Sequence, residues 1–75
     1  MTTYGIVLAP EEDGGYSVIV PALPGCFTQG DSRQEALEMA REAIELHLAA
    51  LRDDGEAIPA DEIQIAEVEV NVPAA

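Results

Sequence analysis

The segment spanning residues 16–37, YSVIVPALPGCFTQGDSRQEAL, constrains the fold of this 75-residue chain more than any other. It combines a β-branched run, a Pro24-Gly25 corner, a second short run and a helix-capping pair. Pro24-Gly25 fits the centre of a type II turn, because proline fixes φ and glycine accepts a positive φ. The segment therefore predicts a strand, a tight corner, a short strand and the start of a helix, in that order.

A hairpin is predicted before this segment. Residues 4–9 form a short apolar run that predicts a strand, and Pro10 ends it because proline cannot donate a hydrogen bond to a ladder. The polar loop over residues 11–15 contains Asp-Gly-Gly, which supplies the positive φ that a hairpin requires. The chain then returns over residues 16–20, and residues 26–29 follow the corner as a third strand.

A helix is predicted over residues 33–54, with Gly55 just past its end. Ser32 and Glu35 have the spacing of a capping box, and Asp31 with Gln34 is the alternative one residue earlier. Apolar positions at spacings of three and four form one stripe: Ala36, Leu37, Ala40, Ile44, His47, Leu48 and Leu51.

The C-terminal part predicts a last strand. Valine or alanine alternates with Glu or Asn over residues 66–72, as in a half-exposed strand. Ile63 and Ile65 have the opposite parity, so a bulge is expected near Ile65-Ala66. The fold class is therefore α+β, in the order β-β-β-α-β, with one helix packed on one face of an antiparallel sheet. One domain is expected to cover residues 1–75.

The first two strands carry apolar side chains on both faces. One helix covers only one face of a sheet, so the other face stays apolar and requires a partner. We expect a homo-oligomer that forms through this face, at Val7, Ala9 and Ile19.

The charge is strongly acidic. Fifteen carboxylates stand against three arginines, and the formal net charge is −12. A field of this sign repels phosphates, so we expect this chain alone to bind neither nucleic acid nor anionic membranes. Two interpretations remain open: the acids only keep the surface solvated, or they steer a basic partner to it.

The compartment follows from what the sequence lacks. A single cysteine excludes an intrachain disulfide and favours a reducing compartment. The N-terminus lacks the basic and apolar regions of a signal peptide, and no run reaches the roughly 20 apolar residues of a membrane span. We expect a cytoplasmic protein.

Residues with catalytic chemistry are isolated. His47 is the lone histidine and lies on the helical stripe, so core packing is favoured over a role as a base. Cys26 is expected to be a small buried hydrophobe, since one Cys and one His match no zinc spacing. Tyr16 and Phe27 are expected in the core rather than as base-stacking groups. No enzyme activity, metal or cofactor is expected.

Several runs together resemble the HicB antitoxin family. They extend through Ile58-Pro59 and so cover nearly the whole chain. They are Asp13-Gly14-Gly15-Tyr16, Val20-Pro21-Ala22-Leu23-Pro24-Gly25-Cys26, Thr28-Gln29-Gly30-Asp31-Ser32, Glu35-Ala36-Leu37 and Ala40-Arg41-Glu42-Ala43-Ile44.

The resemblance implies a partial ribonuclease-H-like fold without the catalytic carboxylates. It also implies the antitoxin role in a type II toxin–antitoxin pair. The partner implied is a HicA-like toxin, a small basic RNase that cleaves mRNA, whose RNA-binding and catalytic surface the antitoxin masks. Many family members carry a C-terminal DNA-binding segment. Because this sequence ends at Ala75, just after the last predicted strand, we expect no operator binding by this chain.

If the antitoxin interpretation holds, the contact residues are expected to be acids: Glu11, Glu12, Asp13, Glu38, Glu42 and Glu45. One alternative is an orphan oligomeric HicB-like module with a regulatory or ligand-binding role and no toxin. The other is a residual ribonuclease-H-like nuclease that would depend on Asp13 or Asp31.

Overall fold

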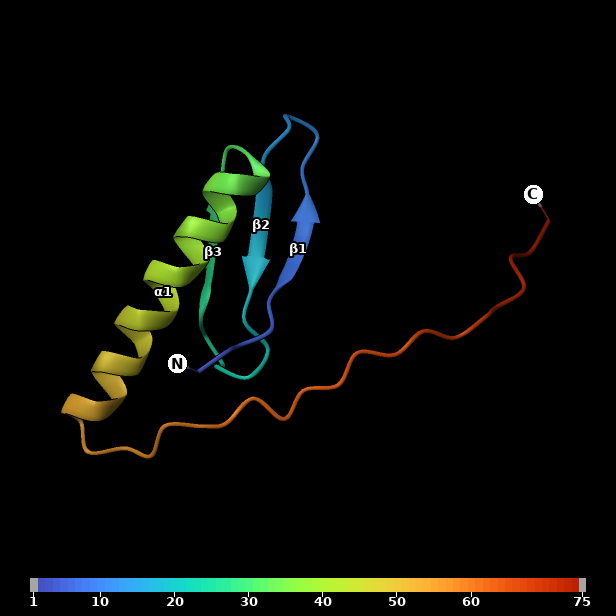
Figure 1. Cartoon of the computed structure of the whole chain (residues 1–75). Helices are drawn as coiled ribbons and strands as arrows, with labels where there is room; N and C mark the ends of the chain where they lie inside the picture. Colours follow the sequence, from blue (N-terminus) through green and yellow to red (C-terminus); the bar gives the residue numbers. More distant parts are fainter. Residues whose placement is uncertain (1, 75) are drawn as a thin grey trace.

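The computed structural model describes residues 2–74 as a three-stranded antiparallel sheet with one helix on one face (Figure 1). The strand order is β1-β2-β3, and the helix lies against β3 and β2. The elements are β1 (Val7–Pro10), β2 (Tyr16–Ile19), β3 (Phe27–Gly30) and α1 (Arg33–Asp53). The α+β class, with a helix on one face of an antiparallel sheet, is confirmed.

The hairpin between β1 and β2 has the glycine dependence that its sequence predicts. Gly14 has φ +92°, and the Glu11 N–H donates to the Gly15 carbonyl oxygen at 2.8 Å. The Asp13 carboxylate accepts a hydrogen bond from the Gly15 N–H at 2.9 Å. Asp13 therefore stabilises the turn itself.

The corner between β2 and β3 is the predicted type II turn. Gly25 has φ +83°, and the Cys26 N–H donates to the Leu23 carbonyl oxygen at 2.9 Å across it. The Val20 N–H also donates to the Cys26 carbonyl oxygen at 3.0 Å. These bonds hold the corner tightly enough for Leu23 to be fully buried.

Both ends of α1 are capped. The Ser32 hydroxyl accepts from the Glu35 N–H at 3.1 Å, and the Glu35 carboxylate accepts from the Asp31 N–H at 3.2 Å. Of the two predicted N-cap residues, Ser32 is therefore the one that caps the helix. At the other end Gly55 has φ +71°, and two bonds of a Schellman motif close the helix: Gly55 N–H to Arg52 O at 3.0 Å and Glu56 N–H to Leu51 O at 2.9 Å.

The core is small and lies between the helix and the sheet. It consists of two buried clusters. One contains Val18, Ala36 and Ala40, and the other contains Val20, Leu23 and Cys26. The helix presents alanines where it meets the strands, which lets the two backbones approach closely. Leu37, although on the predicted apolar stripe, remains 40% exposed.

Phe27 was wrongly expected in the core. Its neighbours Cys26 and Thr28 turn toward the helix side, so alternation along β3 places Phe27 on the opposite face, where it is 73% exposed. The tight corner sets this parity, because burial of Cys26 leaves only the outer face for the next residue.

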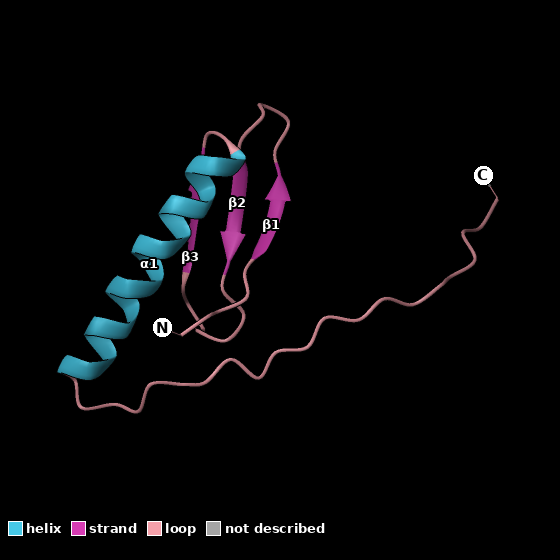
Figure 2. Cartoon of the chain, viewed as in Figure 1, coloured by secondary structure: helices cyan, strands magenta, loops and turns pink. Residues whose placement is uncertain are grey.

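The predicted last strand over residues 66–72 is not part of the sheet. Among residues 2–74, those after α1 form no helix or strand, and the chain leaves the body in an extended course (Figure 2). Val68, Val70 and Val72 are 84%, 73% and 84% exposed. A strand must form hydrogen bonds with a neighbouring strand, and this segment does not lie along either edge of its own sheet.

Gly30 is required where β3 meets the helix. A Cβ atom added there would lie 2.7 Å from the Ala36 Cα and 2.8 Å from the Glu35 carbonyl carbon, both of which are backbone atoms. We expect Gly30→Ala to lower the free energy of unfolding by about 3 kcal/mol, because the backbone must separate. Urea denaturation measures this change. Gly5→Ala is the control, since its Cβ would meet only the Asp61 Oδ2 at 3.4 Å. Equal effects of the two substitutions would contradict this role for Gly30.

Candidate protein-binding surfaces

The sheet face that points away from α1 carries an apolar row across all three strands. The register pairs Val7 with Ile19 and Ile19 with Phe27. Their exposed fractions are 41%, 56% and 73%. We call this the outer row. It contains two of the three residues predicted for self-association, and Ala9 lies on the same face, opposite Ser17 in the next row. Their role as an interface stays a prediction.

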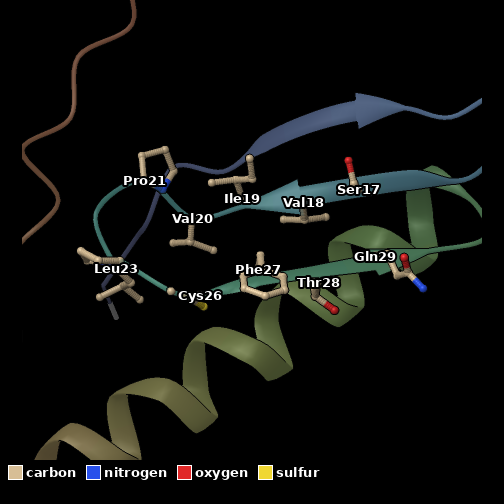
Figure 3. A pocket seen from close by; sticks show the side chains of 12 residues that line it. Ser17, Val18, Ile19, Val20, Pro21, Leu23, Cys26, Phe27, Thr28 and Gln29 are labelled. Carbon is tan, nitrogen blue, oxygen red and sulfur yellow. The ribbon is translucent and has the colours of Figure 1, made fainter.

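A hollow of about 560 Å³ lies beside this row, between β2, β3 and the corner that joins them (Figure 3). Its lining side chains are apolar or neutral, and they include Ile19, Phe27, Pro21, Ser17 and Gln29. Sequence reasoning did not include Phe27 in this surface. Strict alternation from the buried Cys26 was the signal that could have found it.

The six predicted contact acids lie on two different surfaces. Glu11, Glu12 and Asp13 are exposed at the tip of the β1–β2 hairpin. Glu38, Glu42 and Glu45 are exposed along α1. Glu38 and Glu42 share a shallow depression with Gln34, Leu37 and Arg41. Each of these two surfaces concentrates negative charge. The hairpin tip and the α1 surface do not form one continuous acidic patch.

Asp13 and Asp31 are the two carboxylates on which nuclease activity would depend. Asp13 is bound to the Gly15 N–H, and Asp31 follows β3 near the same glycine. In residues 2–74 no group of three or more His, Cys, Asp or Glu side chains is arranged to hold a metal ion.

Cys26 belongs to a buried core cluster, as the sequence predicts for a small buried hydrophobe. Cys26 is a buried free cysteine, and burial raises the pKa of its thiol. The thiol is therefore protonated and unreactive at neutral pH. His47 is half-buried on α1.

The segment after α1 is fixed at one point beside the start of β1. The Tyr4 hydroxyl donates to the Pro59 carbonyl oxygen at 2.6 Å, and the Gly5 N–H donates to the Asp61 Oδ2 at 2.6 Å. The Asp61 Oδ1 also accepts from the Ile63 N–H at 3.0 Å. The bond from Gly5, followed by that from Ile63, lowers the pKa of the Asp61 carboxyl below its usual value.

In the part of the chain that the structure describes, no helix is both long and apolar enough to traverse a lipid bilayer.

Residues 4–73 match the model of a family described as the HicB-like antitoxin of bacterial toxin–antitoxin systems. The chain is 48% identical over 58 residues to a UPF0150 protein of Thermoplasma acidophilum, a match that covers 77% of this chain and 84% of that protein.

Two relatives carry the name antitoxin HicB. Antitoxin HicB 1 of Photorhabdus laumondii is 46% identical and antitoxin HicB of Escherichia coli is 36% identical, each over 56 residues or 75% of this chain. The match spans only 36% and 41% of the length of these two proteins.

The anchor at Asp61 predicts a pH dependence. A carboxyl whose pKa is lower when folded stabilises its contacts above its unfolded pKa, and this stabilisation is lost as the pH falls through the folded value. We expect the Gly5 and Ile63 amide resonances to report docking at neutral pH and release in acid, below the ordinary aspartate range. Amide NMR during a pH titration checks this. Asp61→Asn should remove the titration from both amides, and a titration that persists in this variant would contradict the assignment.

Proposed function

The chain belongs to the HicB-like antitoxin family of bacterial toxin–antitoxin systems, and from this premise we propose that it neutralises a small basic HicA-type toxin that cleaves mRNA. Neutralisation consists of covering the RNA-binding and catalytic surface of the toxin. The family match over residues 4–73 is the observation that carries this proposal, because an antitoxin of this family implies a toxin partner.

The charge of the chain supports a basic partner. Fifteen carboxylates face three arginines, and Arg52 with Asp53 is the one salt bridge within residues 2–74, at 3.4 Å on the surface. Most of the negative charge is therefore not neutralised internally. Such a surface attracts a basic protein from a distance and competes with RNA for the same cations.

The proposed role is binding rather than catalysis. The side chains that line the hollow between β2, β3 and their corner are neutral, and the thiol of Cys26 is buried. We place the protein in the cytoplasm, where an mRNA-cleaving partner acts. We also propose that the fold is related to that of ribonuclease H. This chain alone is proposed to bind no nucleic acid.

The acids of the two surfaces are proposed to make the toxin contact. Glu11 and Glu12 are the cleaner probes at the hairpin, because Asp13 also stabilises the turn. On α1, Glu38, Glu42 and Glu45 project from a helix whose core contacts are made by its other side.

A second candidate function is favoured by the outer row. A homo-oligomeric module without a toxin would use Val7, Ile19 and Phe27 to bury an apolar face that the helix does not cover.

Charge reversal tests the toxin contact. With a small basic HicA-type toxin as the partner, Glu11→Lys with Glu12→Lys, or Glu38→Lys with Glu42→Lys, should slow association about tenfold at low salt and much less at high salt. Stopped-flow fluorescence at several salt concentrations measures this. Glu62→Lys with Glu56→Lys is the matched control. Equal slowing by the control, or no salt dependence, places the tested acids outside the interface, and failure of the partner to bind the unmodified chain rejects the toxin proposal.

Polar substitutions test the outer row. Ile19→Ser with Phe27→Ser should weaken self-association, and because both side chains are exposed, the free energy of unfolding should change little. Sedimentation equilibrium measures the association. Leu46→Ser, at a side chain that is 75% exposed on α1, is the control. A monomer at high micromolar concentration before any substitution contradicts this second function.

A further inference from the structure

The C-terminal residues 64–72, which we call the arm, have the pattern of a strand but no ladder. Ala66, Val68, Val70 and Val72 lie on one parity, while Glu67 and Glu69 lie on the other. The three valines are at least 73% exposed. An extended segment with one apolar face is unstable in water unless that face and its backbone groups find a partner.

The edge of β1 offers the missing backbone partner. Among residues 2–74, β1 pairs with β2 alone, so its other side is free. The Glu11–Gly15 hydrogen bond sets the alternation of the ladder, which places the backbone groups of Leu8 and Pro10 on the free side. Leu8 supplies both a donor and an acceptor there. Pro10 supplies only an acceptor and so limits the ladder at that end.

A groove of about 640 Å³ lies next to this edge, on the helix side. It exists because α1 packs on β3 and β2, which leaves the flank of the helix toward β1 uncovered. Its lining is largely apolar, through Tyr4, Ile6, Leu37, Ala40, Ile44 and Leu48, and it also contains Thr2, Thr3, Arg41 and Glu45. A strand added to β1 would direct every second side chain into this groove. The valines of the arm have that spacing.

The course of the chain directs the arm away from its own groove. Asp61 binds the Gly5 N–H and, through its other oxygen, the Ile63 N–H. This double contact anchors the root of the arm at the start of β1 and turns the chain outward. Beyond it, the segment runs away from the sheet to the C-terminus (Figure 1). An arm fixed in this way is positioned for another molecule.

We propose that the arm of one chain pairs with the free edge of β1 in a second copy and inserts Val68 and Val70 into the groove between β1 and α1, with the exchange being reciprocal. Two-fold symmetry makes each chain both donor and acceptor, so both grooves and both edges are covered. Glu67 and Glu69 then point to solvent on the opposite face. This interface is distinct from the outer row, which lies on the other side of the sheet.

Substitutions on the two sides of the contact test the exchange in the full-length chain. Val68→Asn with Val70→Asn, or Leu37→Asn in the groove, should each raise the dissociation constant of the dimer at least about tenfold, because each removes apolar burial. Analytical ultracentrifugation measures it. Glu67→Gln with Glu69→Gln controls for the arm and Leu46→Asn for the helix. Neither should weaken the dimer. An unchanged dissociation constant in the Leu37 variant overturns the groove as the docking site.

Amide hydrogen exchange separates exchange between chains from the other possibilities. We expect slow exchange at alternate amides of residues 67–70 that appears with the dimer as concentration rises. Protection of the same amides in a monomer means that the arm closes on its own sheet, and fast exchange at all concentrations means that it stays free. Either outcome overturns the proposal.

Salt separates this interface from toxin binding. Two chains of net charge −12 repel each other, so dimer formation should strengthen as salt rises, whereas association with a basic toxin should weaken. A dimer that weakens with salt contradicts an interface made of apolar side chains between like-charged copies. Because the two salt dependences are opposite, failure of one proposal is distinguishable from failure of the other.

Discussion

The close packing of α1 on the end of β3 is the contact on which the rest of this structure depends. Gly30 and Ala36 meet there with no room for a further carbon atom, and Ala36 and Ala40 bury their faces against Val18. Small side chains bring the backbones together, so a helix of 21 residues can be held by a core of few buried residues. The capping of α1 by Ser32 starts the helix at the position that this contact requires.

A core of this size leaves much of the apolar surface unburied. The helix covers two strands on one face, which leaves the outer row, the groove beside β1 and the arm without partners. In a small domain such surfaces are where binding energy is available, because burying them in a complex gains what the monomer cannot. The acids proposed for toxin contact lie at the hairpin tip and along α1, where Glu45 also lines the groove beside β1. The outer row is separate from these acids, whereas the groove beside β1 shares Glu45 with the acidic surface of α1.

Local features of the fold were predictable because their causes are local. Pro24-Gly25, Gly14, Ser32 with Glu35, and Gly55 each act within about five residues, and each has the conformation that its sequence predicts. Val7, Ala9 and Ile19 lie on the sheet face away from α1, as alternation along the strands predicts, and their role in self-association stays a prediction. Phe27 was missed although its exposed face follows by the same alternation from Cys26, whose burial the sequence also predicts.

The amino-acid sequence by itself determined the turns, the caps, the strand parities and an acidic surface, because these follow from φ preferences, hydrogen bonds between near neighbours and net charge. Only the tertiary structure decided where α1 lies across the sheet, and hence which apolar residues remain open. It also decided the fate of residues 66–72, whose alternation specifies a strand but not its neighbour. A β-ladder is formed by two segments, and the pattern of one segment carries no information about which edge lies within its reach.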